Sequence, residues 1–413
     1  MPRVPRGRDE VPLTMRIAFI GCGYVADYYA RTLALHSELE LVCVADRDAA
    51  RATAFADFHG YHVASVADIL ADGSIELVLN LTSAASHFDV SRAALESGKH
   101  VYSEKPLALD FSQAELLVRL ATSRGLILGV APGNVLGESA QTLWKAVRDG
   151  VIGTPRLVYA ELDDGPIHRM DYRDWRSASG APWPWKDEFE TGCALEHAGY
   201  YLSWLAAFFG VASRVTTFAS TLVPEKAPDA LLARHTPDFS VACIEYASGL
   251  VARLTCSILA PRDHSITIIG DDGTLTVHDC WDDGSPVILN ASSSKSSSKS
   301  SASRTPASTI SKWLPFLSRG PLSDGAVTLP LLREPPLRLP STGGNRMDFA
   351  RGVAEVAAAV RERRDCRLGG DYALHIAEIM LAMQYPGRMG SPRMLQSRFS
   401  PIAPMNWATG SGG

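Results

Sequence analysis

The sequence lacks a hydrophobic run that could cross a bilayer. Its longest apolar stretch, residues 202–212, is about half as long as a membrane-spanning helix, which needs roughly 20 residues, and it contains Ser203. The first residues carry three arginines but no apolar segment, so we do not expect a secretory signal there. We therefore expect a cytoplasmic protein without a membrane partner.

Strong charge and paired cysteines are lacking as well. The formal net charge is −5, and no stripe of lysines and arginines indicates a nucleic-acid partner. The seven cysteines are scattered, and none forms a Cys-x-x-Cys pair. Such usage is typical of free thiols in a reducing compartment and argues against a disulfide framework or a zinc site. We expect no bound metal.

What the chain has is enough length for two domains. Its 413 residues exceed one typical domain. Short apolar runs alternate with helical patterns over residues 15–132, which predicts an α/β domain with a doubly wound parallel sheet. Residues 1–14 are polar and contain prolines, and we expect a flexible N-terminal tail there.

Past residue 132 the pattern changes to closely spaced strands. We expect strands at 156–162, 214–222, 238–246, 250–259, 265–270 and 274–278, and helices at 194–209, 350–361 and 372–383. Short connections favour antiparallel or mixed pairing. Residues 133–390 are therefore predicted to form an α+β domain with a large open sheet. A serine-rich segment, 291–303, is expected to be a flexible loop, and 391–413 a C-terminal tail.

Residues 16–26 predict a buried strand, a tight glycine turn and the start of a helix. Gly21 and Gly23 lack a Cβ, so the backbone can turn sharply and approach a ligand closely. Ala26 lets the helix pack against the strand. The helix start, with Tyr24 and Val25, offers free N–H groups and a partial positive charge that suit a pyrophosphate. The alternative is an ordinary strand–helix unit whose glycines serve only the turn.

An acid follows the second predicted strand. The apolar run 39–45 ends in Asp46, about 20 residues beyond Ala26, where a carboxylate can bind the ribose hydroxyls of a dinucleotide. Arg47 could lie against the adenine or attract a 2′-phosphate, or it could be a solvated loop residue. Because Asp46 would repel a 2′-phosphate, the sequence favours NAD as the cofactor, with NADP possible.

Two more predicted strands deliver polar residues to the same sheet edge. The run 75–81 ends in Thr82, and the strand 100–102 leads to Glu104, Lys105 and Pro106. Ligands bind at this carboxyl edge in open α/β sheets. Lys105 could bind a substrate hydroxyl, relay its proton or stabilise a developing alkoxide, and Pro106 fixes the turn. The alternative for Lys105 is a solvated charge.

Five spaced motifs together resemble the Gfo/Idh/MocA family, the glucose-fructose oxidoreductase and inositol dehydrogenase group. They are residues 21–26, Thr82 with His87, residues 104–106, residues 149–153 and residues 269–275. The resemblance implies a Rossmann domain, and a second domain whose sheet often forms an oligomer interface. It implies NAD(P)-dependent redox chemistry on sugars, cyclitols or nucleotide-sugars, with Lys105 as the catalytic lysine and Thr82 and His87 near the nicotinamide ribose. A homodimer or homotetramer is expected.

The chain departs from that family in the helix of its second domain. Where the family carries G-G-G-x-x-x-D-x-G-x-H, residues 191–201 place His197 at the aspartate and Tyr201 at the histidine. Their i, i+4 spacing puts both on one helical face, so we expect both to be catalytic, with Tyr201 handling a proton beside Lys105. Glu196 is expected to point elsewhere. The alternative is that His197 and Tyr201 are packed core residues.

The segment before that helix mixes aromatic and charged residues. Arg173, Trp175 and Trp183 suit sugar recognition, because ring faces stack on C–H patches and charged groups bind hydroxyls. With Lys105, His197 and Tyr201 they form the predicted substrate-binding set. The alternative is a structural loop packed by its own tryptophans.

These residues lead to three functional hypotheses. The first is an oxidoreductase that transfers a hydride between NAD(P) and a hydroxyl or keto group of a carbohydrate, with Lys105 and Tyr201 managing the proton. The second is a lyase or glycosidase-type enzyme that recycles a tightly held NAD. The third is a dinucleotide- or sugar-binding protein without catalysis. The substrate and the direction of reaction stay open.

Overall fold

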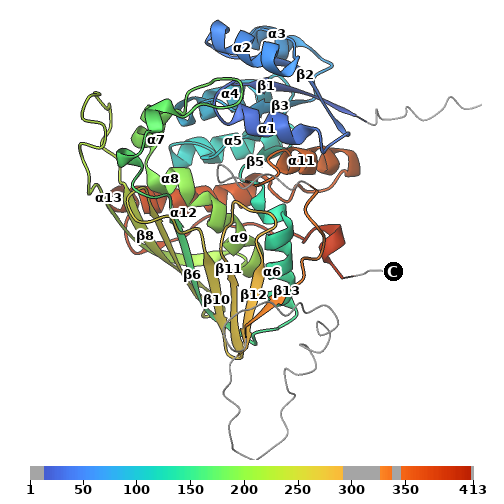
Figure 1. Ribbon diagram of the computed structural model, residues 1–413. Coiled ribbons are helices and arrows are strands. Elements are labelled where there is room, and N and C mark those ends of the chain that lie inside the picture. Colours follow the sequence, from blue (N-terminus) through green and yellow to red (C-terminus); the bar gives the residue numbers. More distant parts are fainter. Residues whose placement is uncertain (1–13, 292–325, 337–345, 411–413) are drawn as a thin grey trace, which may run out of the picture.

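The computed structural model describes residues 14–291, 326–336 and 346–410, and it contains two sheets with helices between them (Figure 1). The predicted N-terminal tail and serine-rich loop lie almost entirely outside the described residues. All seven cysteines are described, and all are free thiols. Within the described ranges, no helix is long and apolar enough to cross a membrane.

The first sheet is parallel and has the strand order β2-β1-β3-β4-β5. Its strands are β1 Met15–Ile20, β2 Leu39–Ala45, β3 Leu77–Asn80, β4 His100–Ser103 and β5 Leu128–Val130. The connecting helices are α1 Ala26–Leu33, α2 Ala49–His59, α3 Val66–Ala71, α4 His87–Glu96 and α5 Phe111–Ser123. The predicted doubly wound α/β fold is confirmed.

Local sequence signals explain where these helices begin. Asp48 accepts hydrogen bonds from the backbone N–H groups of the first turn of α2, and Ser65 and Asp110 do the same for α3 and α5. The strand β3 is buried along its whole length, as its nearly continuous apolar run predicts for a sheet covered on both faces.

The second sheet has nine strands in the order β13-β12-β11-β10-β6-β9-β8-β7-β14. Its strands are β6 Pro155–Asp163, β7 Ala212–Ser220, β8 Phe239–Tyr246, β9 Val251–Ser257, β10 Ile266–Gly270, β11 Gly273–Val277, β12 Val287–Ala291, β13 Ala326–Leu329 and β14 Arg393–Met394. Only β6 and β9 pair in parallel, and the other neighbours are antiparallel. The predicted large mixed sheet is confirmed.

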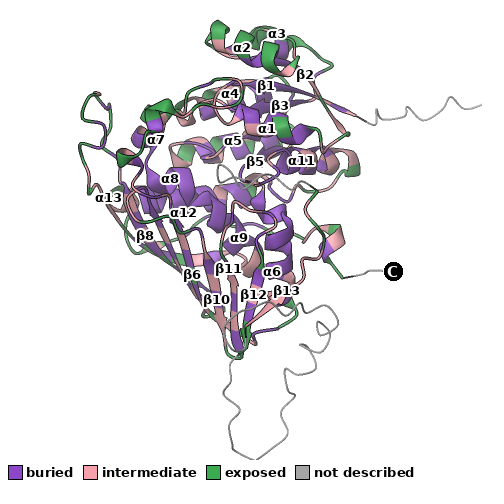
Figure 2. Cartoon of the chain, in the orientation of Figure 1, coloured by how far each residue is buried: buried purple, intermediate pink, exposed green. Residues whose placement is uncertain are grey.

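Helices cover one face of this second sheet. They are α6 Glu138–Arg148, α8 Cys193–His197, α9 Gly199–Phe209, α12 Gly370–Gln384 and the short α13 Pro386–Met389, whereas α7 Trp185–Thr191 packs against α8. Figure 2 shows buried residues concentrated in α8, α9 and α12. The helix α12 packs against α5 and β5 on one side and against β7 and β8 on the other, so it lies between the two sheets (Figure 1).

The last part of the chain returns to both sheets. Helix α11, Arg351–Glu362, packs against β4 and β5, although it follows the second sheet in sequence. A Cβ at Gly129 of β5 would lie 2.5 Å from a methyl carbon of Val356, so the glycine permits this close packing. The predicted C-terminal tail begins with β14, which pairs with β7 as an edge strand.

Candidate active site

The glycine turn after β1 has the geometry that a dinucleotide requires. Gly21 has φ +108°, and a Cβ there would lie 2.4 Å from the carbonyl oxygen of Leu81. A Cβ at Gly23 would meet nothing within 4 Å, so this side of the turn is open to a ligand. The residue before α1, Val25, gives no side-chain cap to the helix N-terminus. The free N–H groups and the open glycine fit a pyrophosphate.

Asp46 is held beside this turn. Its Oδ2 accepts a hydrogen bond from the backbone N–H of Cys22 at 2.8 Å, and its Oδ1 accepts one from Asp48 N–H at 2.8 Å. Each carboxylate oxygen keeps a lone pair for a ribose hydroxyl. Arg47 is exposed at the end of the same strand. The adenosine half of an NAD molecule therefore fits the residues that are present.

His87 is buried behind the ligand edge. Its Nδ1 lies 2.7 Å from the carbonyl oxygen of Pro106, and its Nε2 lies 2.9 Å from that of Thr82. Burial lowers the pKa of the imidazole. Both ring nitrogens face backbone carbonyl oxygens, so neutral His87 donates to the loop after β3 or to the loop after β4, and only the protonated ring donates to both. This geometry supports a positioning role in place of the predicted direct contact with the cofactor.

Glu104 anchors the turn that carries the lysine. Its Oε1 accepts a hydrogen bond from the hydroxyl of Tyr29 at 2.6 Å, and its Oε2 accepts one from the backbone N–H of Lys105 at 3.0 Å. The Pro106 carbonyl is held by His87 on the other side. The backbone of Lys105 is therefore fixed, and its side chain projects from a rigid base.

The ammonium group of Lys105 pairs with Glu196. The distance from Nζ to Oε2 is 2.5 Å, and the two side chains are 15% and 9% exposed. Burial opposes the charge on Lys105, but the attraction of Glu196 outweighs it and raises the pKa of the amine well above its usual value. The prediction that Glu196 points elsewhere was wrong, because this carboxylate is the direct partner of Lys105.

Tyr200 lies on the same side as Glu196. Burial raises the pKa of its phenol, and the positive charge of Lys105 opposes that rise. Glu196 and Tyr200 are four residues apart, so they share one face of the helical segment formed by α8 and α9. This face is directed at Lys105. The predicted face, that of His197 and Tyr201, is displaced from it by one residue along the helix.

His197 and Tyr201 share the neighbouring face and contact a different group. His197 Nε2 lies 2.9 Å from Asp164 Oδ2, and His264 Nε2 lies 2.9 Å from Asp164 Oδ1. The hydroxyl of Tyr201 donates to the backbone carbonyl of His264, and its side chain is fully buried. The predicted partnership between Tyr201 and Lys105 is therefore corrected. His197 and Tyr201 do share one helical face, as their i, i+4 spacing predicts, but this face is directed at Asp164 and His264 and not at Lys105.

Asp164 is the shared partner of His197 and His264. Burial favours its neutral form, but His197 and His264 outweigh this effect and lower the pKa of the carboxyl. The ring of Trp281 packs edge-on against His264, with the ring centres 4.3 Å apart. Among the described residues, no cluster has the ligands for a metal ion.

The aromatic segment before α7 packs mainly on itself. Trp175 and Trp183 have ring centres 5.0 Å apart, and the guanidinium of Arg173 lies 4.9 Å from the ring centre of Trp185. These contacts favour the alternative of a loop held by its own tryptophans. For Arg173, Trp175 and Trp183, substrate binding stays a prediction.

The same segment is attached to the first domain through Ser179, a contact that the sequence pattern did not signal. The Ser179 hydroxyl donates to Asp27 Oδ2 at 2.7 Å, and its backbone N–H donates to Asp27 Oδ1 at 3.2 Å. His59 Nε2 also lies 2.7 Å from Asp27 Oδ1. Because Asp27 lies in α1 directly after the glycine turn, this contact brings the loop beside the cofactor site.

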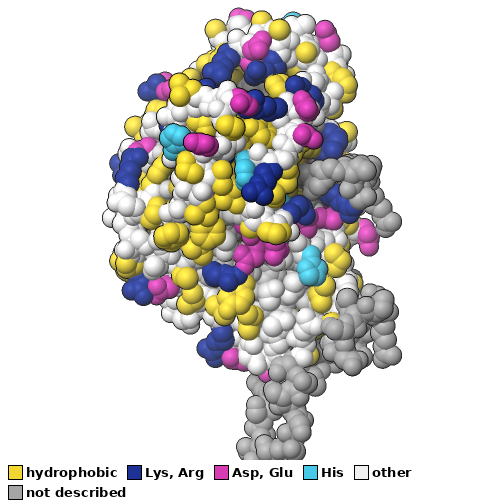
Figure 3. All heavy atoms as spheres, turned by 60° about the vertical axis from the view of Figure 1, so that its left-hand side comes forward, with side chains coloured by type: hydrophobic (Ala, Val, Ile, Leu, Met, Phe, Trp, Pro, Cys, Tyr) yellow, Lys and Arg dark blue, Asp and Glu magenta, His cyan; other side chains and the backbone are white. Residues whose placement is uncertain are grey.

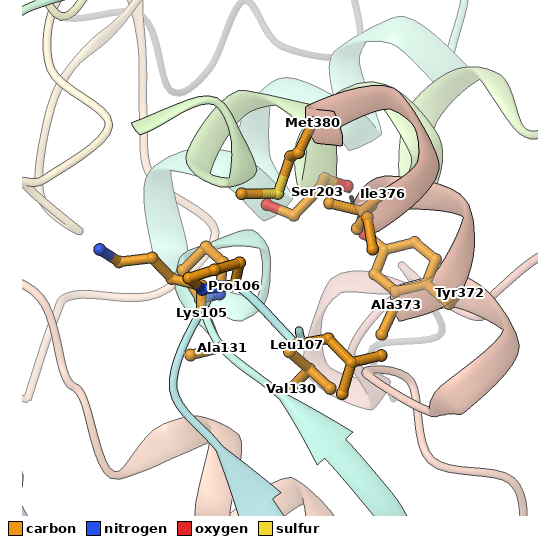
Figure 4. A pocket seen from close by; sticks show the side chains of 12 residues that line it. Lys105, Pro106, Leu107, Val130, Ala131, Ser203, Tyr372, Ala373, Ile376 and Met380 are labelled. Atoms are coloured by element: carbon orange, nitrogen blue, oxygen red, sulfur yellow. Dashed lines mark hydrogen bonds between the residues drawn. The ribbon is translucent and has the colours of Figure 1, made fainter. Parts of the chain in front are cut away.

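A narrow hollow beside the lysine turn does not hold the reacting groups. Leu107, Tyr372, Ile376 and Met380 are among the residues that line it. Figure 4 shows that the amino group of Lys105 points away from this lining. The chemistry therefore belongs to the opposite side of the turn, where Glu196 lies.

Two family models match the chain. Residues 15–131 match the NAD-binding Rossmann fold of the Gfo/Idh/MocA oxidoreductase family, and residues 140–276 match a C-terminal domain of the same family. Together they cover the first sheet, the Lys105 turn and the strands of the second sheet from β6 to β11, but not β12, β13 and β14.

Similar proteins agree with this assignment. The trans-1,2-dihydrobenzene-1,2-diol dehydrogenase of Bos taurus is 26% identical over 277 residues, which cover 65% of this chain and 76% of the relative. The inositol 2-dehydrogenase of Rhizobium meliloti is 26% identical over 160 residues, 39% of this chain and 48% of the relative.

Solved structures share the fold. A 3-ketoreductase from Actinomadura kijaniata in complex with NADP has a TM-score of 0.66 at 19% identity, and the match covers 94% of this chain and 100% of the other. The WlbA dehydrogenase of Bordetella pertussis, in complex with NADH and UDP-GlcNAcA, has a TM-score of 0.65 at 19% identity and coverages of 93% and 99%. This chain belongs to the Gfo/Idh/MocA family of NAD(P)-dependent oxidoreductases.

Proposed function

We propose that the protein transfers a hydride between NAD(P) and a hydroxyl-bearing or keto carbon of a sugar, cyclitol or nucleotide-sugar. The observation that carries this proposal is Lys105, whose charged amine projects from a fixed turn at the carboxyl edge of the parallel sheet. The names of similar proteins, which include diol and inositol dehydrogenases, support this substrate class.

One group of residues binds the dinucleotide, and another binds the substrate oxygen and handles its proton. The dinucleotide, when bound, supplies or accepts the hydride. The turn at Gly21 and Gly23 holds its pyrophosphate, and Asp46 holds its ribose. Lys105 donates a hydrogen bond to the substrate oxygen and stabilises negative charge there as the carbon changes between alcohol and ketone. Tyr200 shares the helical face of Glu196, the partner of Lys105, so we assign it a part in positioning that oxygen.

We propose NAD as the preferred cofactor. Asp46 is fixed by two backbone N–H groups, so its negative charge stays where a 2′-phosphate would lie. Fluorescence titration with NADH and NADPH tests the preference. Tighter binding of NADH is expected, and equal or tighter binding of NADPH would reverse the assignment.

We also propose that the protein is a homodimer or homotetramer joined through the uncovered face of the second sheet. We call this the open sheet face, and it includes Tyr159, Phe218, Val241, Arg253 and Met394. Tyr159, Phe218 and Met394 are 40%, 58% and 65% exposed. Such large exposed apolar groups on one sheet indicate an interface. Figure 3, which brings the left-hand side of Figure 1 forward, shows hydrophobic side chains interspersed with charged ones across the middle of that side of the molecule.

The experiment for the main proposal is a turnover screen. The purified protein is mixed with NAD⁺ or NADP⁺ and with myo-inositol, trans-1,2-dihydrobenzene-1,2-diol or UDP-N-acetylglucosamine, and nicotinamide absorbance is followed. Net formation of NADH or NADPH with a polyol or sugar is expected. Product formation without net cofactor reduction would replace the proposal with internal recycling of the cofactor.

A further inference from the structure

We propose that residues 175–183, which we call the latch, close one side of the dinucleotide site, and that opening of the latch is a step in entry and exit of the cofactor. Ser179 is the latch residue of the second domain, and Asp27 in α1 is its partner in the first domain. This inference rests on the proposed function, because the ligand that the latch retains is the dinucleotide.

The latch is a hairpin closed by its own contacts, with Ser179 at its tip. The backbone N–H of Trp183 donates to the carbonyl of Trp175 at 3.0 Å, and the two rings have centres 5.0 Å apart. Gly180 has φ +89°, a value that favours glycine, so the chain reverses directly after Ser179. The hairpin therefore presents Ser179 to the first domain.

A buried carboxylate in the first domain receives this tip. Asp27 is only 6% exposed, and its two oxygens accept the Ser179 hydroxyl at 2.7 Å and the Ser179 backbone N–H at 3.2 Å. His59 Nε2, at the end of α2, lies 2.7 Å from Asp27 Oδ1. Hydrogen bonds to a carboxylate that is shielded from water are strong. Asp27 therefore holds a hairpin of the second domain against two helices of the first.

A second contact attaches the same segment at the other end of the site. From the latch the chain continues through α7 to Glu196, whose carboxylate lies 2.5 Å from the amine of Lys105. Residues 179–196 therefore meet the first domain twice, through Asp27 beside the glycine turn and through Lys105 at the lysine turn. In the proposed function the pyrophosphate lies at the glycine turn and the reacting end of the dinucleotide lies near the lysine turn. This segment thus extends along the cofactor site, so one of its two contacts has to open for a dinucleotide to pass on this side.

The latch is the contact of the two that opens more readily. Lys105 and Glu196 carry opposite charges and are 15% and 9% exposed, whereas Ser179 is a neutral donor. Residues 176–180 are exposed or half-buried. Because segments with few buried contacts open at the lowest free-energy cost, the tip of the hairpin can leave Asp27 while the rest of the domain stays folded.

The first test measures association and dissociation of NADH by stopped-flow fluorescence. Ser179→Ala removes the hydroxyl donor and should raise both rate constants roughly 10-fold, the size expected for loss of one hydrogen bond to a charged group. Both should rise, and Kd should change much less than either, because an open latch eases passage in both directions. Ser179→Thr keeps a hydroxyl and should restore the wild-type rates. Ser97→Ala, an exposed serine before β4 at the opposite edge of the first sheet, is the control.

A second measurement needs no cofactor. Deuterium exchange of the backbone amides of residues 175–183 is followed by mass spectrometry in the protein alone. Ser179→Ala should raise the exchange rate of these amides roughly 10-fold, because exchange reports opening of the segment. Ser97→Ala should exchange there like the wild type. Thermal melts check that each variant is folded.

The outcomes separate the latch from the proposed function. If the wild type binds neither NADH nor NADPH, both fail. If NADH binds and Ser179→Ala exchanges it at wild-type rates, the latch is overturned and the oxidoreductase stands. A rise in the dissociation rate alone would make Ser179 a residue that contacts the bound dinucleotide, and it would overturn the latch as well. Wild-type deuterium exchange in Ser179→Ala would do the same.

Discussion

At the scale of single residues, backbone geometry separates the roles of two glycines. Gly21 has a positive φ and no room for a Cβ. Gly23 has room for a Cβ on the side where a ligand would lie. Both belong to one sequence motif, and the motif alone does not tell their roles apart. The contact between Gly21 and Leu81 tells them apart, and Leu81 follows a strand some 60 residues further along the chain.

Gly21→Ala should lower the free energy of unfolding by roughly 1–3 kcal/mol, because it places a Cβ against the Leu81 carbonyl at an unfavourable φ. Gly23→Ala should leave stability close to wild type and weaken NADH binding instead. Urea unfolding and NADH fluorescence titration measure the two effects. Equal losses of stability in both variants would contradict this division.

Two adjacent tyrosines give a second test at this scale. Tyr201→Phe removes the hydrogen bond to the His264 carbonyl, so it should cost about 1 kcal/mol of stability and leave kcat close to wild type. Tyr200→Phe should lower kcat with little change in stability, because Tyr200 faces Lys105. The reverse pattern would restore the role that the sequence motif predicts for Tyr201.

At the scale of elements, the sequence predicted the strands and helices but not which helical face meets the lysine. Alternating apolar runs define β1 to β5, and that pattern is local. Adjacent residues on a helix are separated by a rotation of about 100°. An error of one residue in assigning the face that meets the lysine therefore puts His197 in the place of Glu196. That rotation is set by packing against α12 and the second sheet, which the local pattern does not contain.

A part-buried contact between the turn after α1 and the segment before α11 predicts a pH effect. His36 Nε2 lies 2.9 Å from Asp348 Oδ2. Burial disfavours the charged imidazole, but Asp348 and Glu38 outweigh it and raise the pKa of His36 above 6.5. Its contribution to stability is therefore full below pH 6.5 and is lost as the pH rises through the raised pKa.

His36→Gln should remove part of the loss of stability between about pH 6 and about pH 8, because it removes that titrating group. His62→Gln changes an exposed histidine of the same domain and serves as the control. Urea unfolding at both pH values measures the difference. An unchanged pH dependence in His36→Gln would show that the contact with Asp348 does not titrate in this range.

At the scale of the whole molecule, α12 packs between two sheets that the sequence predicts as separate domains, and α11 returns to the first of them. The division near residue 132 could be predicted because the strand pattern changes there. The return of α11 to β4 and β5 could not, because it depends on contacts between distant segments. The open sheet face is visible only once the covering helices are placed on one side of the second sheet.

The open sheet face gives the prediction for assembly. Tyr159, on β6, lies at the centre of this face. The guanidinium of Arg253 stacks 4.4 Å from the centre of the Tyr159 ring. Tyr159→Glu should shift the protein from oligomer to monomer in light scattering, because it removes a large exposed ring from the centre of this face and adds a negative charge there. Leu116→Glu, on the exposed side of α5, is the control. A wild-type monomer, or a Tyr159→Glu oligomer, would contradict this interface.

The most direct test of the central claim is the turnover of Lys105→Ala with a substrate that the wild type accepts. We expect a fall in kcat of roughly 100-fold or more with NADH affinity retained, because the variant loses the group that binds the substrate oxygen and transfers its proton. Lys186→Ala, an exposed lysine on α7, should remain active. Unchanged turnover in Lys105→Ala would remove Lys105 from the mechanism and contradict the proposed site.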